Sequence, residues 1–196
     1  YTSHSTYAQD EFYLTDDLKI VAGLRYDWIT TSDRPLENTA FTESYGYSNT
    51  ANLDGVDLLH PRVGFNYTVS DSTEVRGGFG LFSGGNPNVW ISNNYSNNGV
   101  TLTDYFAPDD SNLADFTYSD TGRPFFDVPD EAIADIAGAS GRGGVNALDP
   151  NFEIPSEWKF AFGAVADVDT NMPILGNDLR VMADILYSKT NEAAQV

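Results

Sequence analysis

The chain has 196 residues, which is enough for one ordinary domain with a sizeable core. Its 29 acidic residues outnumber the 10 basic ones and give a formal net charge of −19, so the sequence lacks the basic surface that nucleic-acid binding requires. There is no cysteine, and the 11 Tyr, 12 Phe and 17 Gly favour strands and turns over helices. No stretch approaches the roughly 18 consecutive apolar residues of a membrane-spanning helix. The first residues do not show the basic segment and following apolar segment of a signal peptide, so a targeting signal is expected to lie outside residues 1–196.

The first two predicted strands cover about residues 6–14 and 18–30, with a short polar turn between them. The first strand alternates poorly, because Asp10 shares a parity with Phe12, so the orientation of its faces stays open. The second strand is the most regular in the chain, with apolar residues from Leu18 to Trp28 at every second position. These 11 residues match the ~9–11 that a tilted strand needs to cross a bilayer. Tyr26 and Trp28 are expected at an interfacial aromatic girdle.

A polar loop is predicted at about 31–58, and a hairpin with strands at 61–69 and 73–83 follows it. The second loop, at about 84–154, is longer and is expected to hold one short helix at 132–137, preceded by Pro129 and ended by Gly138. The last two strands are predicted at 156–167 and 178–189. The turn between them is expected to be longer than the first two turns.

Apolar and basic side chains fall on opposite faces of the later strands. The apolar face holds Leu, Ile, Val, Phe, Ala, Gly, Tyr and Trp without a charge. The other face carries the residues that we predict to face a water-filled lumen: Arg25, Arg62, Arg76, Lys159 and Arg180. A basic residue at a bilayer midplane costs ~2–4 kcal/mol, so this separation is energetically meaningful. It is typical of a barrel wall with lipid outside and water inside.

The predicted fold class is therefore all-β: an antiparallel up-and-down transmembrane β-barrel segment of about six strands with long extracellular loops. Short turns at one end of the strands and long loops at the other are typical of outer-membrane barrels. Soluble sandwiches space their turns more evenly. Six strands are fewer than the ~8 of the smallest single-chain barrels and would leave exposed edges. We therefore expect residues 1–196 to be part of a larger barrel, with further strands before Tyr1 and after Val196.

Three stretches resemble one protein family. YAQDEFYLTDDLKIVAGLRYD, at 7–27, is similar to the barrel repeat of TonB-dependent outer-membrane receptors, in which a Tyr-x-Gln-Asp strand runs through a tight turn into Gly-Leu-Arg-Tyr-Asp. HPRVGFNYTVSDSTEVRGGFGLFSGGNP, at 60–87, resembles the next hairpin of that family, particularly in the Oar-like branch with a carboxypeptidase-regulatory-like N-terminal domain. LDPNFEIPSEWKFAFG, at 148–163, resembles the start of a later strand in that branch.

The resemblance implies a receptor of the bacterial outer membrane. Its barrel would have about twenty-two strands and would be closed by an N-terminal plug. Its outer loops would bind a substrate, and the TonB complex of the inner membrane would drive import through the barrel. The implied partners are outer-membrane lipid, the rest of the barrel with its plug, and the TonB complex.

The second loop contains the candidate ligand-binding residues: Trp90, Asn93, Asn94, Tyr95 and Tyr105. Aromatic rings in outer loops can stack on sugars, peptides or aromatic chelates, and the asparagines add neutral hydrogen-bonding groups. The same rings can instead form a small core of the loop itself, and this interpretation is preferred.

No catalytic site, metal site or cofactor is predicted, and the chain is not expected to be an enzyme, because nothing places an acid beside a base. His4 and His60 lack the spacing of metal ligands, so His60 is assigned a structural or solvated role. The acidic residues between Asp109 and Glu131 offer oxygen ligands to Ca²⁺, but their spacing is not that of an EF-hand. A solvated acidic surface is the preferred interpretation.

One alternative belongs to a different functional class. A secreted soluble β-sandwich, acting as an adhesin or a glycan-binding module, could use the acidic loops to bind calcium. It predicts solubility without detergent, and it predicts that the apolar faces of the strands meet across a dry gap between two sheets.

Overall fold

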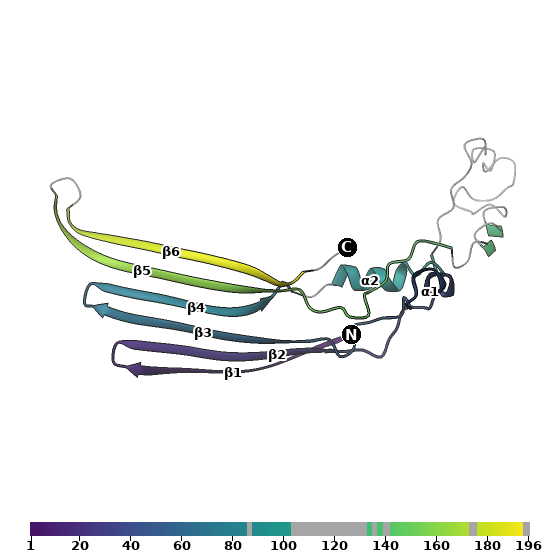
Figure 1. The fold of residues 1–196 in the computed structure, drawn as a ribbon, viewed down its shortest axis with the longest axis horizontal. Coiled ribbons are helices and arrows are strands. Elements are labelled where there is room, and N and C mark those ends of the chain that lie inside the picture. The colour runs from purple at the N-terminus through teal and green to yellow at the C-terminus, as the bar shows by residue number, and fades with distance from the viewer. Residues whose placement is uncertain (86–87, 103–132, 135–136, 139–141, 173–175, 194–196) are drawn as a thin grey trace, which may run out of the picture. The chain divides into compact units, whose positions relative to one another are not determined.

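The computed structural model describes residues 1–85, 88–102, 133–134, 137–138, 142–172 and 176–193 (Figure 1). The predicted helix at 132–137 and the acidic stretch from Asp109 to Glu131 lie wholly or largely outside these residues. The chain forms two compact units. A strand unit comprises Tyr1–Thr31, Leu53–Asn86 and Phe152–Val196, and a loop unit comprises Ser32–Asn52 and Pro87–Asn151.

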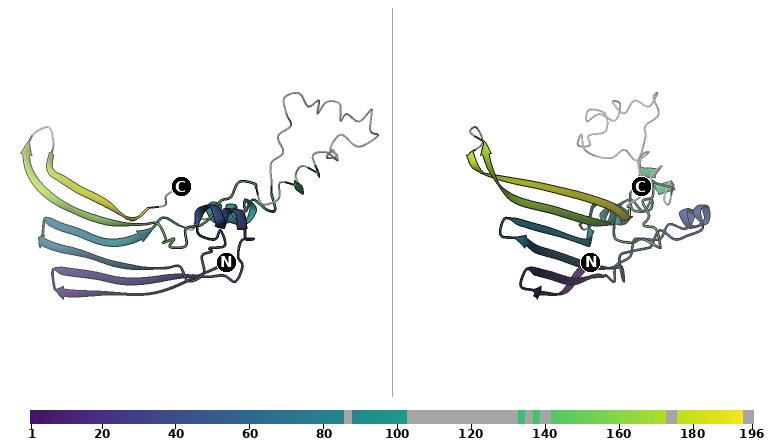
Figure 2. Two further views of the ribbon diagram at one scale, coloured as in Figure 1. Left: turned by 45° about the vertical axis from the view of Figure 1, so that its right-hand side comes forward. Right: turned by 60° about the vertical axis from the view of Figure 1, so that its left-hand side comes forward.

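The strand unit is one antiparallel sheet whose six strands follow the order of the chain (Figures 1 and 2). The strands are β1 (Thr2–Thr15), β2 (Leu18–Thr30), β3 (Asp57–Ser70), β4 (Thr73–Ser83), β5 (Ser156–Met172) and β6 (Gly176–Glu192). Asp16 and Asp17 link β1 to β2, and Asp71 and Ser72 link β3 to β4. The long connections, 31–56 and 84–155, both join strands at their opposite ends, which is the asymmetry expected of an outer-membrane barrel.

Several strands are longer than the sequence analysis predicted. The turn expected at 167–178 is largely strand, because Asp167 pairs with Arg180 and Val168 pairs with Leu179. Aspartates favour turns, but here Val168 continues the apolar parity while the acids take the polar one. In the same way β3 begins at Asp57 instead of near 61, because Leu59 pairs with Tyr26. Alternation predicts these extensions better than residue type does.

The register brings like faces together across all six strands. On the apolar face, Ile20 lies opposite Phe65, Phe79 opposite Phe160, and Phe162 opposite Ile185. The register also settles the faces of β1, which the sequence left open. Phe12 lies opposite Ile20 and Ala8 opposite Leu24, so the even-numbered residues of β1 join the apolar face.

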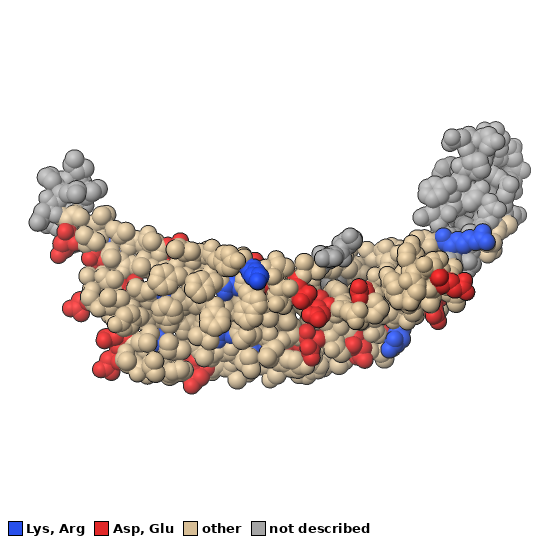
Figure 3. All heavy atoms as spheres, in the orientation of Figure 1, with Lys and Arg blue, Asp and Glu red and all other residues tan. Residues whose placement is uncertain are grey.

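The apolar face is exposed over the described residues. Phe160 is 49% and Ile185 is 65% exposed, and no second sheet of the described chain covers them. In Figure 3 the strand surface turned to the viewer is mostly uncharged, with acidic side chains along its margins. The sandwich alternative predicts that the apolar faces of two sheets meet across a dry gap, and the described residues show no such packing. An exposed apolar face of this size needs an apolar solvent.

Three charged residues depart from the expectation that this face carries no charge. Asp57 and Lys189 lie at the end where the long connections begin, where a membrane-spanning strand reaches water and a long lysine side chain can extend to it. Rings gather at the same end, with Trp28 stacked between His4 (centroids 5.0 Å apart) and Tyr26 (5.4 Å). Asp10, opposite Ala22, is the exception, and its carboxylate accepts a hydrogen bond of 2.9 Å from the backbone N–H of Glu11.

The loop unit contains two short helices that the sequence analysis did not predict, α1 (Thr39–Tyr45) and α2 (Asn88–Ser96). The side chain of Asn38 caps the start of α1 by accepting from the N–H of Phe41, and Gly46 ends the helix with φ of 78°. Both capping residues are visible in the sequence, but the helix between them is too short to show a periodicity. Within the described residues, none of the helices has the length and apolar character that crossing a membrane requires.

The two faces of β2 generate a prediction about membrane assembly. Leu24 lies on the apolar face, whereas Val21 lies on the polar face between Glu11 and Gly64. We expect Leu24→Arg to lower the free energy of unfolding from lipid vesicles by ~2–4 kcal/mol, because the charge would enter hydrocarbon. The matched variant Val21→Arg should change it by less than about 1 kcal/mol, since a cation there gains an acidic neighbour. Denaturant unfolding in vesicles measures both, and equal losses would contradict the assignment of the faces.

Candidate functional site

The polar face of the sheet carries all five residues predicted to face a lumen. Four of them, and Lys19, form ion pairs with acids of the same face. The pairs and their shortest N–O distances are Lys19–Glu11 (2.6 Å), Arg25–Asp27 (2.8 Å), Arg76–Asp184 (3.0 Å), Lys159–Glu157 (3.6 Å) and Arg180–Asp167 (3.8 Å). Arg62 is different, because it makes no ion pair with any carboxylate of the described residues. Its guanidinium lies over the ring of Phe82 instead, 4.6 Å from the centroid.

Most of these pairs are well exposed, so each is expected to add less than about 1 kcal/mol to stability. Their main consequence is electrostatic. Five of the six cations on the described polar face lie within 4 Å of a carboxylate, while most of the surplus acid of the chain lies in the long connections and turns. A wall of this kind keeps charge away from lipid without building a strong field of one sign.

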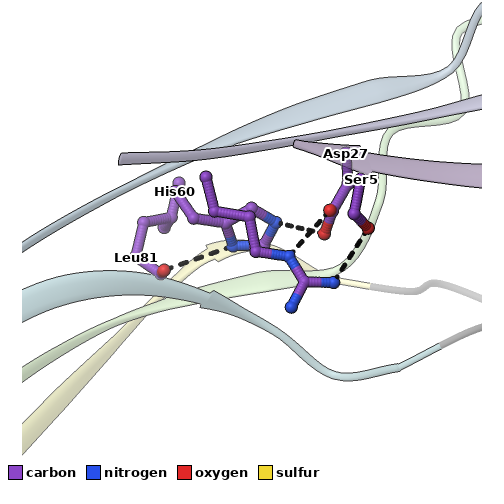
Figure 4. Close-up of polar contacts among 5 residues, drawn as sticks. Ser5, Asp27, His60 and Leu81 are labelled. Atoms are coloured by element: carbon purple, nitrogen blue, oxygen red, sulfur yellow. Dashed lines mark hydrogen bonds and ion pairs between the residues drawn. The ribbon is translucent and has the colours of Figure 1, made fainter. Parts of the chain in front are cut away.

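One ion pair belongs to a larger polar network that spans four strands (Figure 4). Arg25 donates through Nη2 to the hydroxyl of Ser5 at 3.1 Å and through Nε to Oδ1 of Asp27 at 2.8 Å. Nε2 of His60 lies 3.0 Å from Oδ2 of Asp27, at ion-pair distance but out of line for a hydrogen bond. Nδ1 of His60 lies 3.3 Å from the carbonyl oxygen of Leu81. The network therefore ties β1, β2, β3 and β4 together near their long-loop end.

The position of His60 has a local cause in the sequence. The β3–β4 ladder ends at the pair Arg62–Gly80, and the same register places Pro61 opposite Leu81. Proline has no N–H, so the backbone cannot supply a donor at that position. The ring of His60, which is 2% exposed, contacts the Leu81 carbonyl there. His60 is thus a structural residue of the wall, in line with the role assigned from the sequence.

The network gives a prediction about stability. His60→Ala should lower the free energy of unfolding by about 2–4 kcal/mol, because it leaves a cavity and deprives a buried carbonyl of its contact. Arg180→Ala is the matched control, since its pair with Asp167 is 3.8 Å long and the arginine side chain is 67% exposed. We expect that variant to lose less than about 1 kcal/mol. Denaturant titrations in detergent micelles test both variants. If His60→Ala is as stable as Arg180→Ala, the network around His60 does not contribute to the free energy of unfolding.

A hollow of about 600 Å³ opens on the polar face beside Arg62. Small residues from β2 to β5 form its floor, namely Gly23, Gly64, Gly78 and Ala161. Arg62, Phe82 and Lys159 line one side, and Gln9 and Ser188 contribute neutral polar groups. Nζ of Lys159 lies 5.9 Å from the centroid of the Phe82 ring, so this ring is flanked by two cations.

The structure describes four of the five candidate ligand-binding residues, all on α2; Tyr105 lies outside the described residues. With its amide nitrogen turned toward the carbonyls of Trp90 (3.2 Å) and Asn146 (3.3 Å), Asn94 also accepts from the N–H of Leu148 at 3.2 Å. The hydroxyl of Tyr95 donates to the backbone carbonyl of Asp33 at 2.7 Å. Both side chains therefore bond within the loop unit, Asn93 is half-buried, and the ring of Trp90 is 42% exposed. Ligand binding by α2 stays a prediction.

Buried asparagines hold the loop unit together, and the sequence analysis did not identify this role. The side chain of Asn38 donates to the carbonyl of Asn98 at 3.0 Å, and the N–H of Asn38 donates to the side chain of Asn49 at 2.8 Å. Asn98 also accepts from the N–H groups of Val100 (2.9 Å) and Thr101 (2.8 Å). All three asparagines are almost fully buried. Their amides replace the regular backbone pairing that loops lack, and they join the first long connection to the second.

Asn98 allows a test of this packing. Asn98→Ala should cost about 1–3 kcal/mol locally, because the half-buried N–H groups of Val100 and Thr101 lose their acceptor. The amide protons of Val100 and Thr101 should then exchange with solvent about ten times faster or more. Asn97→Ala is the control, since its described hydrogen bonds are made by the backbone alone. Unchanged exchange in the Asn98 variant would mean that the loop unit does not depend on this side chain.

Among the described residues, no group of three or more His, Asp or Glu side chains is arranged to hold a metal ion. The acidic stretch considered for Ca²⁺ lies outside those residues.

Comparison with known proteins identifies the family. The family model described as "Outer membrane beta barrel domain" matches residues 1–172. The chain therefore belongs to the outer-membrane β-barrel domain family, which confirms the predicted all-β barrel fold and the location in the bacterial outer membrane. The match does not distinguish a TonB-dependent receptor from other barrels. No curated protein and no solved structure matched the chain.

Proposed function

We propose that this chain is the wall segment of a TonB-dependent outer-membrane receptor, whose outer loops bind a solute that is then imported through a plugged barrel. The observation that carries this proposal is the combination of an outward apolar face with a charged inner face on strands joined by two long connections at one end. The resemblance of residues 7–27, 60–87 and 148–163 to that receptor family supports it.

The loop unit supports a role in recognition. Its two connections are joined by buried amides and by the bond from Tyr95 to Asp33, so the described part of it is an organised structure. Such a unit can present a fixed surface to a solute, and fixed surfaces lower the entropy lost on binding. Trp90 is the large exposed ring of α2 and offers an apolar platform for a sugar, a peptide or an aromatic chelate.

The polar face supports a role in passage. Its cations other than Arg62 are paired with carboxylates of the described wall, so a solute or a plug would meet mainly alternating charges. The proposed partners are outer-membrane lipid, the remaining barrel with its plug, and the TonB complex. We expect the protein to carry out transport without catalytic turnover.

The proposal is tested by uptake in cells of the source organism. Wild-type cells, cells lacking this gene and cells lacking TonB are compared for uptake of radiolabelled ferric chelates, oligosaccharides and peptides. One of these classes should lose uptake in both deletion strains and regain it when the wild-type gene is restored. Uptake that persists without TonB would indicate a diffusion pore and would contradict the proposal.

Two variants on α2 refine this test. Trp90→Ala should weaken the apparent affinity for the imported class by about two- to tenfold, as expected for loss of one stacked ring. Val89→Ala is the matched control, because Val89 is the neighbouring residue of α2 and is also exposed. Equal effects of the two variants would show that Trp90 has no specific part in recognition.

A further inference from the structure

We propose that the hollow beside Arg62 and Lys159 is a binding site for an organic anion that carries a flat apolar body. This inference rests on the proposed function and names the chemical class of solute that the barrel would take. The shared recognition chemistry is that of a carboxylate or phosphate group attached to a ring.

The guanidinium of Arg62 supplies the first positive charge of the proposed site. Every other cation named on the polar face has a carboxylate within 4 Å, whereas Arg62 has none among the described residues. Arg62 therefore presents an uncompensated guanidinium to the hollow, and a guanidinium can bind carboxylate or phosphate with two parallel hydrogen bonds.

Lys159 supplies the second positive charge of the proposed site. Gly80 pairs with Arg62 on one side and with Lys159 on the other, so the two cations stand on either side of a glycine. Neighbouring strands are ~4.8 Å apart, which places the two backbones about 10 Å from each other. The ring of Phe82 lies over the glycine between them, since a Cβ at Gly80 would be 3.1 Å from that ring. Glu157 approaches Lys159 only to 3.6 Å, and both side chains are exposed. An anion that contacts both cations beside this ring would neutralise both.

The ring of Phe82 and the floor of the hollow define the rest of the ligand. Arg62 and Lys159 both lie near this ring, at 4.6 and 5.9 Å from its centroid, so a solute anion held by them would lie beside an aromatic surface. The floor consists of glycines and Ala161, and Val21 and Leu186 add apolar side chains beside it, which leaves room for a flat apolar body. A volume of about 600 Å³ falls within the ~300–1,000 Å³ typical of small-molecule sites. Gln9 and Ser188 can bond to neutral substituents of the solute.

The test uses the protein in lipid nanodiscs, with 2-naphthoate as the probe and the uncharged 2-naphthamide as its isosteric control. Isothermal titration calorimetry should detect naphthoate binding to the wild-type protein and at least tenfold weaker binding of the amide. Arg62→Gln and Lys159→Gln should each weaken naphthoate binding by about tenfold, as expected for loss of a charged hydrogen bond. Lys19→Gln, which removes a polar-face cation that is paired with Glu11, should leave binding unchanged.

Three outcomes would overturn the proposal. The first is equal binding of naphthoate and naphthamide. The second is equal weakening by the Arg62 and Lys19 variants. The third is no naphthoate binding to the wild-type protein together with a lower thermal unfolding temperature of Arg62→Gln, which would show that a carboxylate of the protein itself occupies the site.

Different results would contradict the proposed anion site and the proposed import role. If uptake is TonB-dependent but naphthoate binding does not respond to Arg62→Gln, the anion site alone is wrong. If naphthoate binds as expected but no uptake depends on TonB, the site stands and the import role is wrong.

Discussion

The structure depends on the separation of apolar and charged side chains onto the two faces of one sheet. The side-chain period of a strand is two residues, so a slip of one residue in any pairing would move every side chain of that strand to the wrong face. In this chain such a slip would place Arg25 and Arg76 in hydrocarbon and Phe65 or Phe160 in water. The cost of that exchange fixes the register of all five strand pairs. The exposed apolar face is then the contact with lipid, and it replaces the buried core of a soluble domain.

With the register fixed, the polar face follows from local chemistry. Cations and carboxylates meet across neighbouring strands, as Arg76 and Asp184 do over Gly163, where a glycine leaves room for their side chains. On the apolar face the ring of Phe65 covers Gly77 in a similar way, since a Cβ at that glycine would lie 2.6 Å from the ring. Glycines of this sheet thus receive side chains from adjacent strands. This explains how strands so rich in glycine remain packed.

The loop unit is organised by a different principle. Its described residues contain few buried apolar side chains, and its most buried residues are asparagines that bond to the backbone of distant segments. Such bonds compensate for the regular pairing that a loop lacks, and they join two connections far apart in the chain. The loop unit has a mostly polar surface with some exposed rings and little hydrophobic burial, so its stability depends on this internal bonding.

The sequence by itself determined the sheet faces of β2 to β6 and the asymmetry of turns and loops, because alternation and turn chemistry are local properties of the chain. Only the tertiary structure decided the faces of β1, where Asp10 obscures the pattern and the pairing of Phe12 with Ile20 settles it. It also decided which carboxylate pairs with which cation, left Arg62 without a carboxylate partner among the described residues, and placed His60 where Pro61 lacks a donor. The asparagine bonds of the loop unit belong to the same group, since they join residues as far apart as Asn38 and Asn98. Contacts of this kind depend on the register and on long-range closure, and no local pattern of residues encodes them.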